Sequence, residues 1–196
     1  MPSLIYEGIY SQICNLSPIT RDQWKEIEPF FIKREYGKND PVEQTGKQSH
    51  SIHILLSGSV RLFYLTKDGK DFNHAFKFEG DIFASYSSLL AKTPSKFSIY
   101  TMEKTTLLSI EYKYMVQHFD KYKEWERLGR LIAETHYLTK ENREYSFLIE
   151  SAEERYRNLL NNDPNLISRV PQYHLATFLG INPSSLNRII KSNIKE

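Results

Sequence analysis

The chain is poor in cysteine and has no long apolar segment. Cys14 is the only cysteine among 196 residues, which excludes an internal disulfide framework and a multi-cysteine zinc or iron–sulfur site within one chain. No stretch approaches ~18 consecutive apolar residues, so no membrane span is expected. The residues from Met1 to Cys14 lack the basic start and the apolar core of a signal peptide. We therefore expect a cytoplasmic protein without a membrane partner.

Sequence motifs of catalysis and metal binding are also missing. There is no phosphate-binding loop, no Gly-x-Ser-x-Gly motif and no pair of carboxylates suited to acid–base chemistry. His50 and His53 could suggest a cupin-like metal site, but Leu55, Leu56 and Ser57 follow where that pattern needs a glutamate. We interpret the two histidines as a surface pair. The sequence thus predicts no enzyme, no metal and no cofactor, and a cupin-type enzyme ranks third among the alternatives.

Positive charge is concentrated near the C-terminus. The chain has 26 basic and 24 acidic residues, which gives a formal net charge of +2. The segment from Arg155 onward carries +4, whereas the residues before it together carry −2. A basic terminal segment indicates a polyanionic partner, and a solvated surface is the alternative.

An amphipathic helix is expected near the N-terminus. Pro18 can begin this helix after a Ser17 cap, and Trp24, Ile27 and Phe31 then fall at helical spacing.

The segment 30–110 has the alternation of apolar and polar residues that is typical of β-strands. Val60, Leu62 and Tyr64 alternate with other residues in one run. Asp68-Gly69 follows as a strong hairpin-turn signal. Several short strands with closely spaced turns predict a sandwich, a barrel or a roll.

Helical spacing replaces the strand pattern from Tyr112 onward. Within this region an a/d seam of about three heptads is formed by Leu128, Leu131, Thr135, Leu138, Asn142, Tyr145 and Ile149. Trp125 and Ile132 lie to one side and can cover the β core. A seam separate from the core face predicts a second helix, most simply from an identical chain. Asn142 would set its register. The alternative is a core helix that packs on two sides.

A further helix is expected after the seam. Ser151 and Glu154 have the spacing of a capping box, and a stop follows at Asp163-Pro164.

Residues 172–191 have the spacing of a helix-turn-helix. Ala176 is small where a second helix must cross, and Gly180 is placed to end the first helix in a left-handed conformation. Asn182 can cap the second helix, and Pro183 suits its first position. The inner positions are Leu175, Leu179, Leu186, Ile189 and Ile190, and the outer ones are Ser184, Ser185, Arg188 and Lys191. This pattern predicts a second helix free to enter a major groove. A structural helical hairpin is the alternative.

With these motifs, the chain resembles the Crp/Fnr family of transcription regulators. The resemblance runs from about Trp24 to Lys191 and is carried by Ile54–Leu62, Thr66–Lys70, Phe78–Phe83 and the segment from Arg155 to the end. The last segment is most similar to the short Crp/Fnr-type regulators common in Bacteroidetes, which end soon after the recognition helix. The resemblance implies a cyclic-nucleotide-binding-like roll, a long dimer helix and RNA polymerase as a partner.

The nucleotide cassette of that family corresponds to Gly80–Ser98. Without gaps, its ribose-binding Gly-Glu falls on Ala84-Ser85, and its phosphate-binding Arg-Ser falls on Ser95-Lys96. The glutamate that would accept the ribose hydroxyl is missing, and so is the guanidinium fork that would neutralise the phosphate. We therefore expect no response to cyclic AMP, and an unknown small effector stays open.

The predicted fold is α+β and has three parts. A β-roll with flanking helices is expected at 1–111, a long dimerisation helix at 112–150 and a small helix-turn-helix domain at 151–196. The expected function is a homodimeric regulator that reads a near-palindromic operator in double-stranded DNA. Base contacts are assigned to Ser184, Ser185 and Arg188, and phosphate contacts to Gln172, Asn182 and Lys191. The alternative is a small-ligand or protein-interaction module that does not bind DNA.

Overall fold

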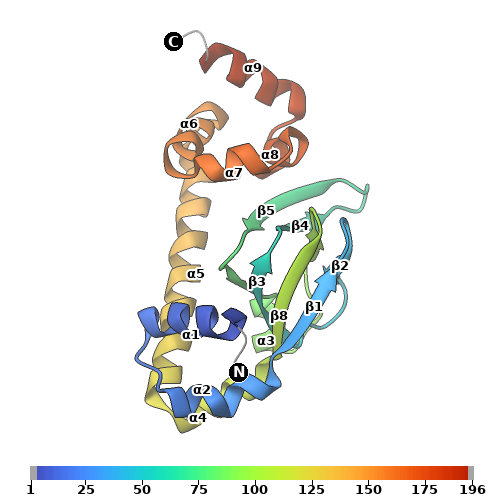
Figure 1. Cartoon of the computed structure of the whole chain (residues 1–196). Coiled ribbons are helices and arrows are strands. Elements are labelled where there is room, and N and C mark those ends of the chain that lie inside the picture. Colours follow the sequence, from blue (N-terminus) through green and yellow to red (C-terminus); the bar gives the residue numbers. More distant parts are fainter. Residues whose placement is uncertain (1–3, 194–196) are drawn as a thin grey trace. The chain divides into compact units, whose positions relative to one another are not determined.

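A computed structural model of the chain describes residues 4–193. It divides into two compact units. The first unit contains the residues up to Arg61 together with Lys77–His136, and the second contains Leu62–Phe76 together with the residues from Tyr137. Figure 1 shows the order of the elements along the chain.

The strands form the β-roll that the sequence predicts. One sheet has the order β1-β8-β3-β6 and the other has the order β2-β7-β4-β5. The printed pairs β1–β8, β3–β8, β3–β6 and β2–β7 are antiparallel. The strands are β1 Ile32–Tyr36, β2 Pro41–Glu43, β3 Ser51–Ser57, β4 Val60–Leu65, β5 Asp71–Lys77, β6 Ile82–Phe83, β7 Ser98–Thr101 and β8 Thr105–Glu111. The predicted α+β class is therefore confirmed.

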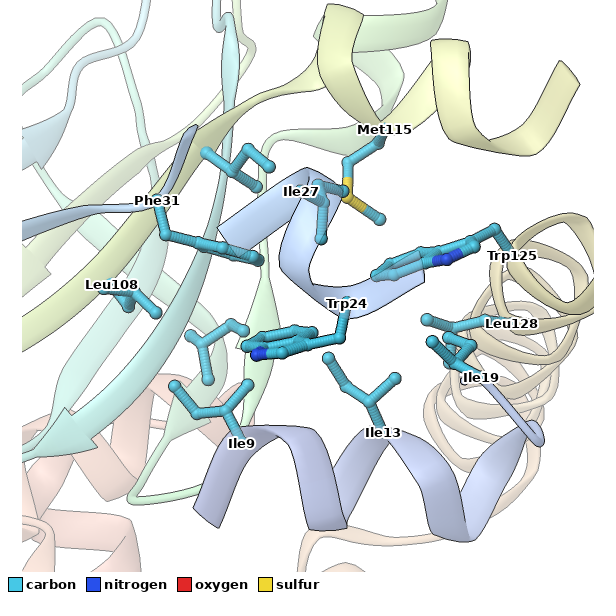
Figure 2. Close-up of a cluster of buried hydrophobic side chains, with 12 residues drawn as sticks. Ile9, Ile13, Ile19, Trp24, Ile27, Phe31, Leu108, Met115, Trp125 and Leu128 are labelled. Carbon is cyan, nitrogen blue, oxygen red and sulfur yellow. The ribbon is translucent and has the colours of Figure 1, made fainter. Parts of the chain in front are cut away.

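The first unit has its main apolar core between the sheet and the helices. Its helices are α1 Leu4–Leu16, α2 Arg21–Ile27, the short 3₁₀ helix η1 Glu28–Phe30, α3 Tyr86–Ala91, α4 Tyr112–Lys121 and the start of α5, which spans Lys123–Ile149. Figure 2 shows Trp24 and Trp125 among the isoleucines of α1 and α2 and Leu108 of β8. Trp125 is fully buried.

The N-terminal amphipathic helix begins later than predicted. α2 starts at Arg21, where Thr20 and Gln23 form a capping box. Ser17 is not a cap, because its hydroxyl donates to the carbonyl of Glu124 at 2.7 Å. Both Ser17 and Thr20 suit a cap by residue type, and this tertiary contact decides between them.

The prediction of one continuous helix from Tyr112 is wrong, because Tyr122 interrupts it between α4 and α5. Tyr122 is extended, with φ −134° and ψ 123°. Its carbonyl accepts from the N–H groups of Trp125 and Glu126, which starts α5 in a new direction. The break lets Trp125 pack against His118, with 5.5 Å between ring centroids. As predicted, Trp125 and Ile132 pack on the core.

The second unit contains the last part of α5 and four further helices. These are α6 Ala152–Asn162, α7 Pro164–Arg169, α8 Gln172–Phe178 and α9 Pro183–Asn193. The capping box of Ser151 and Glu154 is present at the start of α6. Asp163 ends α6 and also caps α7, with Pro164 in its first turn. Among the described residues, no helix combines the length and the apolar character that crossing a membrane requires.

Candidate nucleic-acid interface and roll interior

The turn between α8 and α9 has the hydrogen bonds of a Schellman motif. The N–H of Ile181 donates to the carbonyl of Ala176 at 3.0 Å, and the N–H of Gly180 donates to that of Thr177 at 3.3 Å. Gly180 has φ +74°. A Cβ atom on Gly180 would lie 2.7 Å from Cε1 of Phe147, so glycine is needed for both the backbone angle and the close approach.

The second helix begins as the sequence predicts. The side-chain oxygen of Asn182 accepts from the N–H of Ser185 at 2.8 Å, and Pro183 is the first residue of α9. Ala176 and Leu186 are fully buried. Ile189 and Ile190 are half-buried. The two helices therefore pack through their inner residues and leave the other side of α9 exposed.

The residues proposed to contact DNA lie mostly on that exposed side. Gln172, Asn182, Ser184, Arg188 and Lys191 are exposed, whereas Ser185 is half-buried. The side-chain oxygen of Asn182 accepts the cap hydrogen bond, and the cap does not use its amide N–H groups.

The β4–β5 hairpin contacts α8 within the second unit, and the sequence reasoning missed this contact. Asn73 is 2% exposed, and its side-chain amide donates to the hydroxyl of Thr177 at 2.7 Å. The ring of Phe76 lies 5.4 Å from that of Phe178. Asn73 is a polar residue within the alternating pattern of β5, which could have indicated a buried contact. The sequence does not show that its partner lies on α8.

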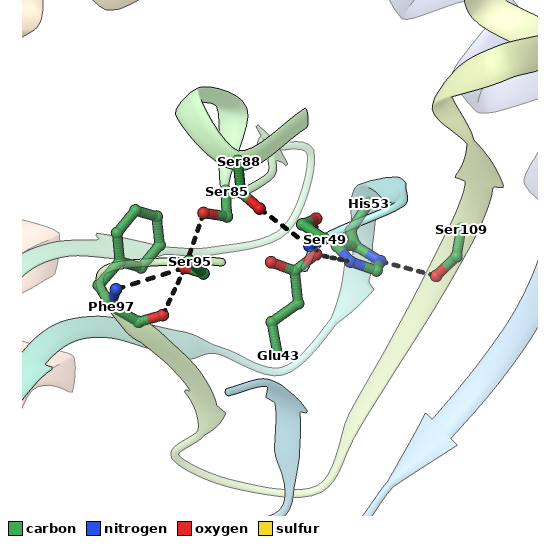
Figure 3. A network of polar contacts seen from close by, with 8 residues as sticks. All are labelled: Glu43, Ser49, His53, Ser85, Ser88, Ser95, Phe97 and Ser109. Atoms are coloured by element: carbon green, nitrogen blue, oxygen red, sulfur yellow. Dashed lines mark hydrogen bonds and ion pairs between the residues drawn. The ribbon is translucent and has the colours of Figure 1, made fainter. Parts of the chain in front are cut away.

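In the segment that corresponds to the nucleotide cassette, two buried serine side chains bond to each other. Ser85 and Ser95 are buried and their hydroxyls lie 2.7 Å apart, as Figure 3 shows. Ser95 also donates to the carbonyl of Phe97 at 2.7 Å. Ala84 is half-buried, and Lys96 is exposed. The structure thus brings the ribose and phosphate positions of the cassette together, but with two neutral hydroxyls.

A second polar network lies beside the cassette. His53 is 4% exposed, so the interpretation of His50 and His53 as a surface pair is wrong for His53. Its Nδ1 lies 2.8 Å from the hydroxyl of Ser109, and its Nε2 lies 3.1 Å from a carboxylate oxygen of Glu43 (Figure 3). Ser49 donates to the same oxygen at 2.6 Å.

This network has the residue types of a hydrolase triad, but its geometry does not fit one. Ser109 is 3% exposed on the central strand β8, so a substrate cannot reach its hydroxyl. His50, by contrast, is exposed. In the part of the chain that the structure describes, no cluster of three or more histidine, cysteine and acidic residues could hold a metal ion.

The predicted seam on α5 is largely exposed, with one exception. Leu138 is 56% exposed, Tyr145 58% and Ile149 67%. Thr135 and Asn142 are exposed, and Leu131 is half-buried. Leu128 is 1% exposed and belongs to the core of the first unit, so its assignment to the seam is corrected. Leu128 has the same helical spacing as the others, but it lies near the start of α5, where the core of the first unit covers it.

Two exposed apolar side chains near the seam were missed. Tyr137 precedes Leu138, and Leu148 follows Tyr145 by one helical turn. Both are more than half exposed.

The comparisons with known proteins give one family match and a shared fold. Residues 33–122 match the cyclic nucleotide-binding domain family. No curated protein sequence is significantly similar to the chain.

Solved structures share the fold at low sequence identity. FixK2 from Bradyrhizobium japonicum has a TM-score of 0.72 at 16% identity, over 83% of each chain. The catabolite activator protein of Thermus thermophilus has a TM-score of 0.57 at 19% identity, over 94% of this chain and 87% of that one. The c-di-GMP responsive regulator CLP of Xanthomonas campestris has a TM-score of 0.70 at 16% identity, over 90% and 92%. Residues 33–122 are therefore similar to the cyclic nucleotide-binding domain family, and the chain has the fold seen in solved Crp/Fnr-type regulators.

Proposed function

We propose that the protein is a homodimeric, sequence-specific DNA-binding transcription regulator that does not respond to cyclic AMP. The observation that carries this proposal is the turn between α8 and α9. Its Schellman bonds, the left-handed Gly180 and the Asn182 cap fix two crossed helices. Leu186 is buried between them, and Arg188 and Lys191 remain exposed. A helix held in this way can enter the major groove with its outer residues toward the bases.

Each outer residue has a role that follows from its chemistry. Arg188 is the strongest candidate for a base contact, because a guanidinium can donate two hydrogen bonds to one guanine. Ser184 and Ser185 are short donors and acceptors near the start of α9. Gln172, Asn182 and Lys191 lie where hydrogen bonds and charge would hold phosphates. The charge of +4 on the segment from Arg155 onward supplies the sequence-independent attraction to phosphates.

The dimer is proposed to form along α5. Leu138, Tyr145 and Ile149 expose apolar surface at a/d spacing, and Leu131 and Thr135 extend the same seam. Full burial of one such leucine or isoleucine contributes about 1.5–3 kcal/mol. Asn142, which is exposed on the seam, would pair with Asn142 of the second chain and set the register of the two helices. Two-fold symmetry then calls for a near-palindromic operator, with half-sites about one helical turn apart.

The roll is proposed to lack cyclic nucleotide binding. A cyclic phosphate carries a charge, and burying that charge without a partner is heavily penalised. Ser85 and Ser95 provide no charge and already bond each other, while Lys96 is exposed. The roll either holds a different small effector or acts as a scaffold for the dimer. RNA polymerase as a partner and a cytoplasmic location follow from the proposed regulatory role.

In vitro selection from a pool of random duplexes tests the proposal. Purified protein should enrich one near-palindromic sequence, and a gel shift should then show a retained complex with it. A pool that stays random after repeated rounds contradicts the proposal and favours the alternative of a small-ligand or protein-interaction module. Metal analysis of the purified protein is the matching test of the cupin-type alternative.

A further inference from the structure

In the second unit, the C-terminal ends of α5 and α8 are held by the same small group of side chains. Phe147, on the last turn of α5, is contacted by two guanidinium groups. The guanidinium carbons of Arg143 and Arg155 are both 4.6 Å from the centroid of its ring. Phe147 is also the side chain that Gly180 approaches. We call Arg143, Phe147 and Arg155 the arginine clamp.

Arg155 connects the two helix ends directly. Its Nε and Nη2 donate to the carbonyl of Leu179, the cap residue of α8, at 3.2 and 3.0 Å. Its Nη1 donates to the carbonyls of Ser146 and Glu150 at the end of α5. The last carbonyls of a helix have no partner inside the helix and carry partial negative charge. A single guanidinium therefore satisfies the ends of both helices at once.

Arg143 adds a second connection to α8. Its Nη2 donates to the carbonyl of Phe178 at 2.9 Å and to the carbonyl of Asn73 at 3.2 Å. Its guanidinium carbon lies 4.3 Å from the ring centroid of Phe178. Burial, and secondly repulsion from Arg155, lower the pKa of Arg143 to about 10. The group stays protonated near pH 7, so both members of the clamp are cations.

The clamp uses helix carbonyls and aromatic rings in place of carboxylates. Among residues 4–193, neither Arg143 nor Arg155 forms an ion pair with an acidic side chain. Keeping two like charges beside one ring is unfavourable unless their hydrogen bonds compensate. The planar, multi-donor shape of a guanidinium makes these bonds possible, whereas the compact ammonium of lysine cannot reproduce them.

We propose that Arg143 and Arg155 are positioning residues, which fix the orientation of the helix-turn-helix relative to the dimer helix and thereby set the half-site spacing that the dimer accepts. This inference rests on the proposed function. Neither side chain needs to touch DNA. The last turns of α5 belong to the proposed dimer seam, and α8 carries α9 through the Gly180 turn. A rigid link between them holds the two recognition helices of a dimer at one separation and one rotation.

Binding to operators of altered spacing tests the proposal. The selected operator is compared with duplexes that carry one base pair more or less between the half-sites, which rotates one half-site by about 34°. Arg143→Lys and Arg155→Lys keep the charge, so attraction to phosphates is unchanged. Arg157→Lys is the matched control on α6, because Arg157 pairs with Glu153 and Asn193 outside the clamp.

The wild type and the Arg157→Lys control should lose about tenfold or more in affinity when the spacing changes, comparable to one mismatched base pair. The two clamp variants should lose much less, because a loosened helix-turn-helix can adjust to the new spacing. A variant that only destabilises the fold lowers the affinity for every spacing by the same factor. That result, or an unchanged spacing preference, overturns the proposal.

A measurement without DNA separates failure of the clamp from failure of the proposed function. Spin labels at Lys140→Cys and Ser192→Cys, in a Cys14→Ser background, report the distance between α5 and α9. An excess of unlabelled chain leaves one labelled chain in each dimer. The distance distribution should be narrow in the wild type and broad in Arg155→Lys. Equally narrow distributions overturn the clamp. If the wild-type protein binds operators of every spacing and sequence equally, the proposed function is wrong. The distance measurement still tests whether the clamp holds α9 in a fixed position relative to α5.

Discussion

Arg188 lies on the exposed side of α9, about one turn into the helix that is proposed to read DNA. Replacing it with alanine should weaken binding to the selected operator by about 1–3 kcal/mol and relax one base position. The reason is the loss of a bidentate contact to guanine. Titration of the variant against the selected operator, followed by a second round of selection, measures both effects. Unchanged affinity and an unchanged selected sequence would show that Arg188 reads no base.

Gly180 has a positive φ that alanine adopts only at a cost. Gly180→Ala should destabilise the second unit by at least about 1–2 kcal/mol, the usual cost of the left-handed conformation for a residue with Cβ. The 2.7 Å approach to Phe147 adds to this cost. Thermal or urea unfolding followed by the amide signals of α8 and α9 gives the measurement. Gly8→Ala is the matched control, because a Cβ there meets no atom within 4 Å. Equal stability of the two variants would contradict the role assigned to Gly180.

Ser85 and Ser95 should prevent cyclic AMP from binding. The two hydroxyls are buried and already bonded to each other, so a phosphate would meet no counter-charge. Isothermal titration of the purified dimer with cyclic AMP should give no heat of binding at micromolar concentrations. A dissociation constant below ~10 µM, equivalent to about −7 kcal/mol, that Lys96→Ala abolishes would show that the cassette functions through that lysine.

At the scale of the elements, the exposed seam of α5 carries the proposal of a dimer. Glutamates introduced at Leu138 and Ile149 should yield monomers with strongly weakened DNA binding. Each new carboxylate would lie in an apolar interface near the same carboxylate of the second chain. Both side chains are more than half exposed in the single chain, so the variant should still fold. Lys140→Glu on the opposite side of α5 is the control. Sedimentation measures the outcome, and wild-type protein that sediments as a monomer at micromolar concentration rules the seam out.

Elements with local signals were predictable from the sequence. The helix-turn-helix is marked by Ala176, Gly180, Asn182 and Pro183 within eight positions, and each of these residues acts through its own backbone or its nearest neighbours. The strands of the roll are marked by alternation and by turn residues in the same way. Such signals need no knowledge of distant contacts.

Features that depend on distant contacts were not predictable. Nothing in the residues around Tyr122 is a helix breaker, and the break follows from the packing of Trp125 into the core. Leu128 continues the spacing of the seam, and only its contacts with the core of the first unit separate it from the exposed residues. His53 was read as exposed because its partners Glu43 and Ser109 come from other strands. The clamp arginines belong to this class as well, because their acceptors are backbone carbonyls, which no sequence pattern marks.

At the scale of the whole molecule, the proposed two-fold symmetry links the seam, the clamp and the recognition helix to one operator. Two copies of α9 would meet half-sites about 34–36 Å apart. The basic segment from Arg155 onward supplies attraction to any DNA, whereas base contacts and correct spacing distinguish the operator from other sequences. Discrimination between sequences should therefore be large relative to non-specific binding.

The ratio of two dissociation constants tests this central claim most directly. Wild-type protein is titrated, at one fixed salt concentration near the physiological value, against the selected operator and against a duplex of the same base composition in scrambled order. The account predicts that the operator binds at least ~10³-fold more tightly, the lower end of the range for specific regulators. A ratio close to one would contradict the account, and so would the absence of binding to both duplexes.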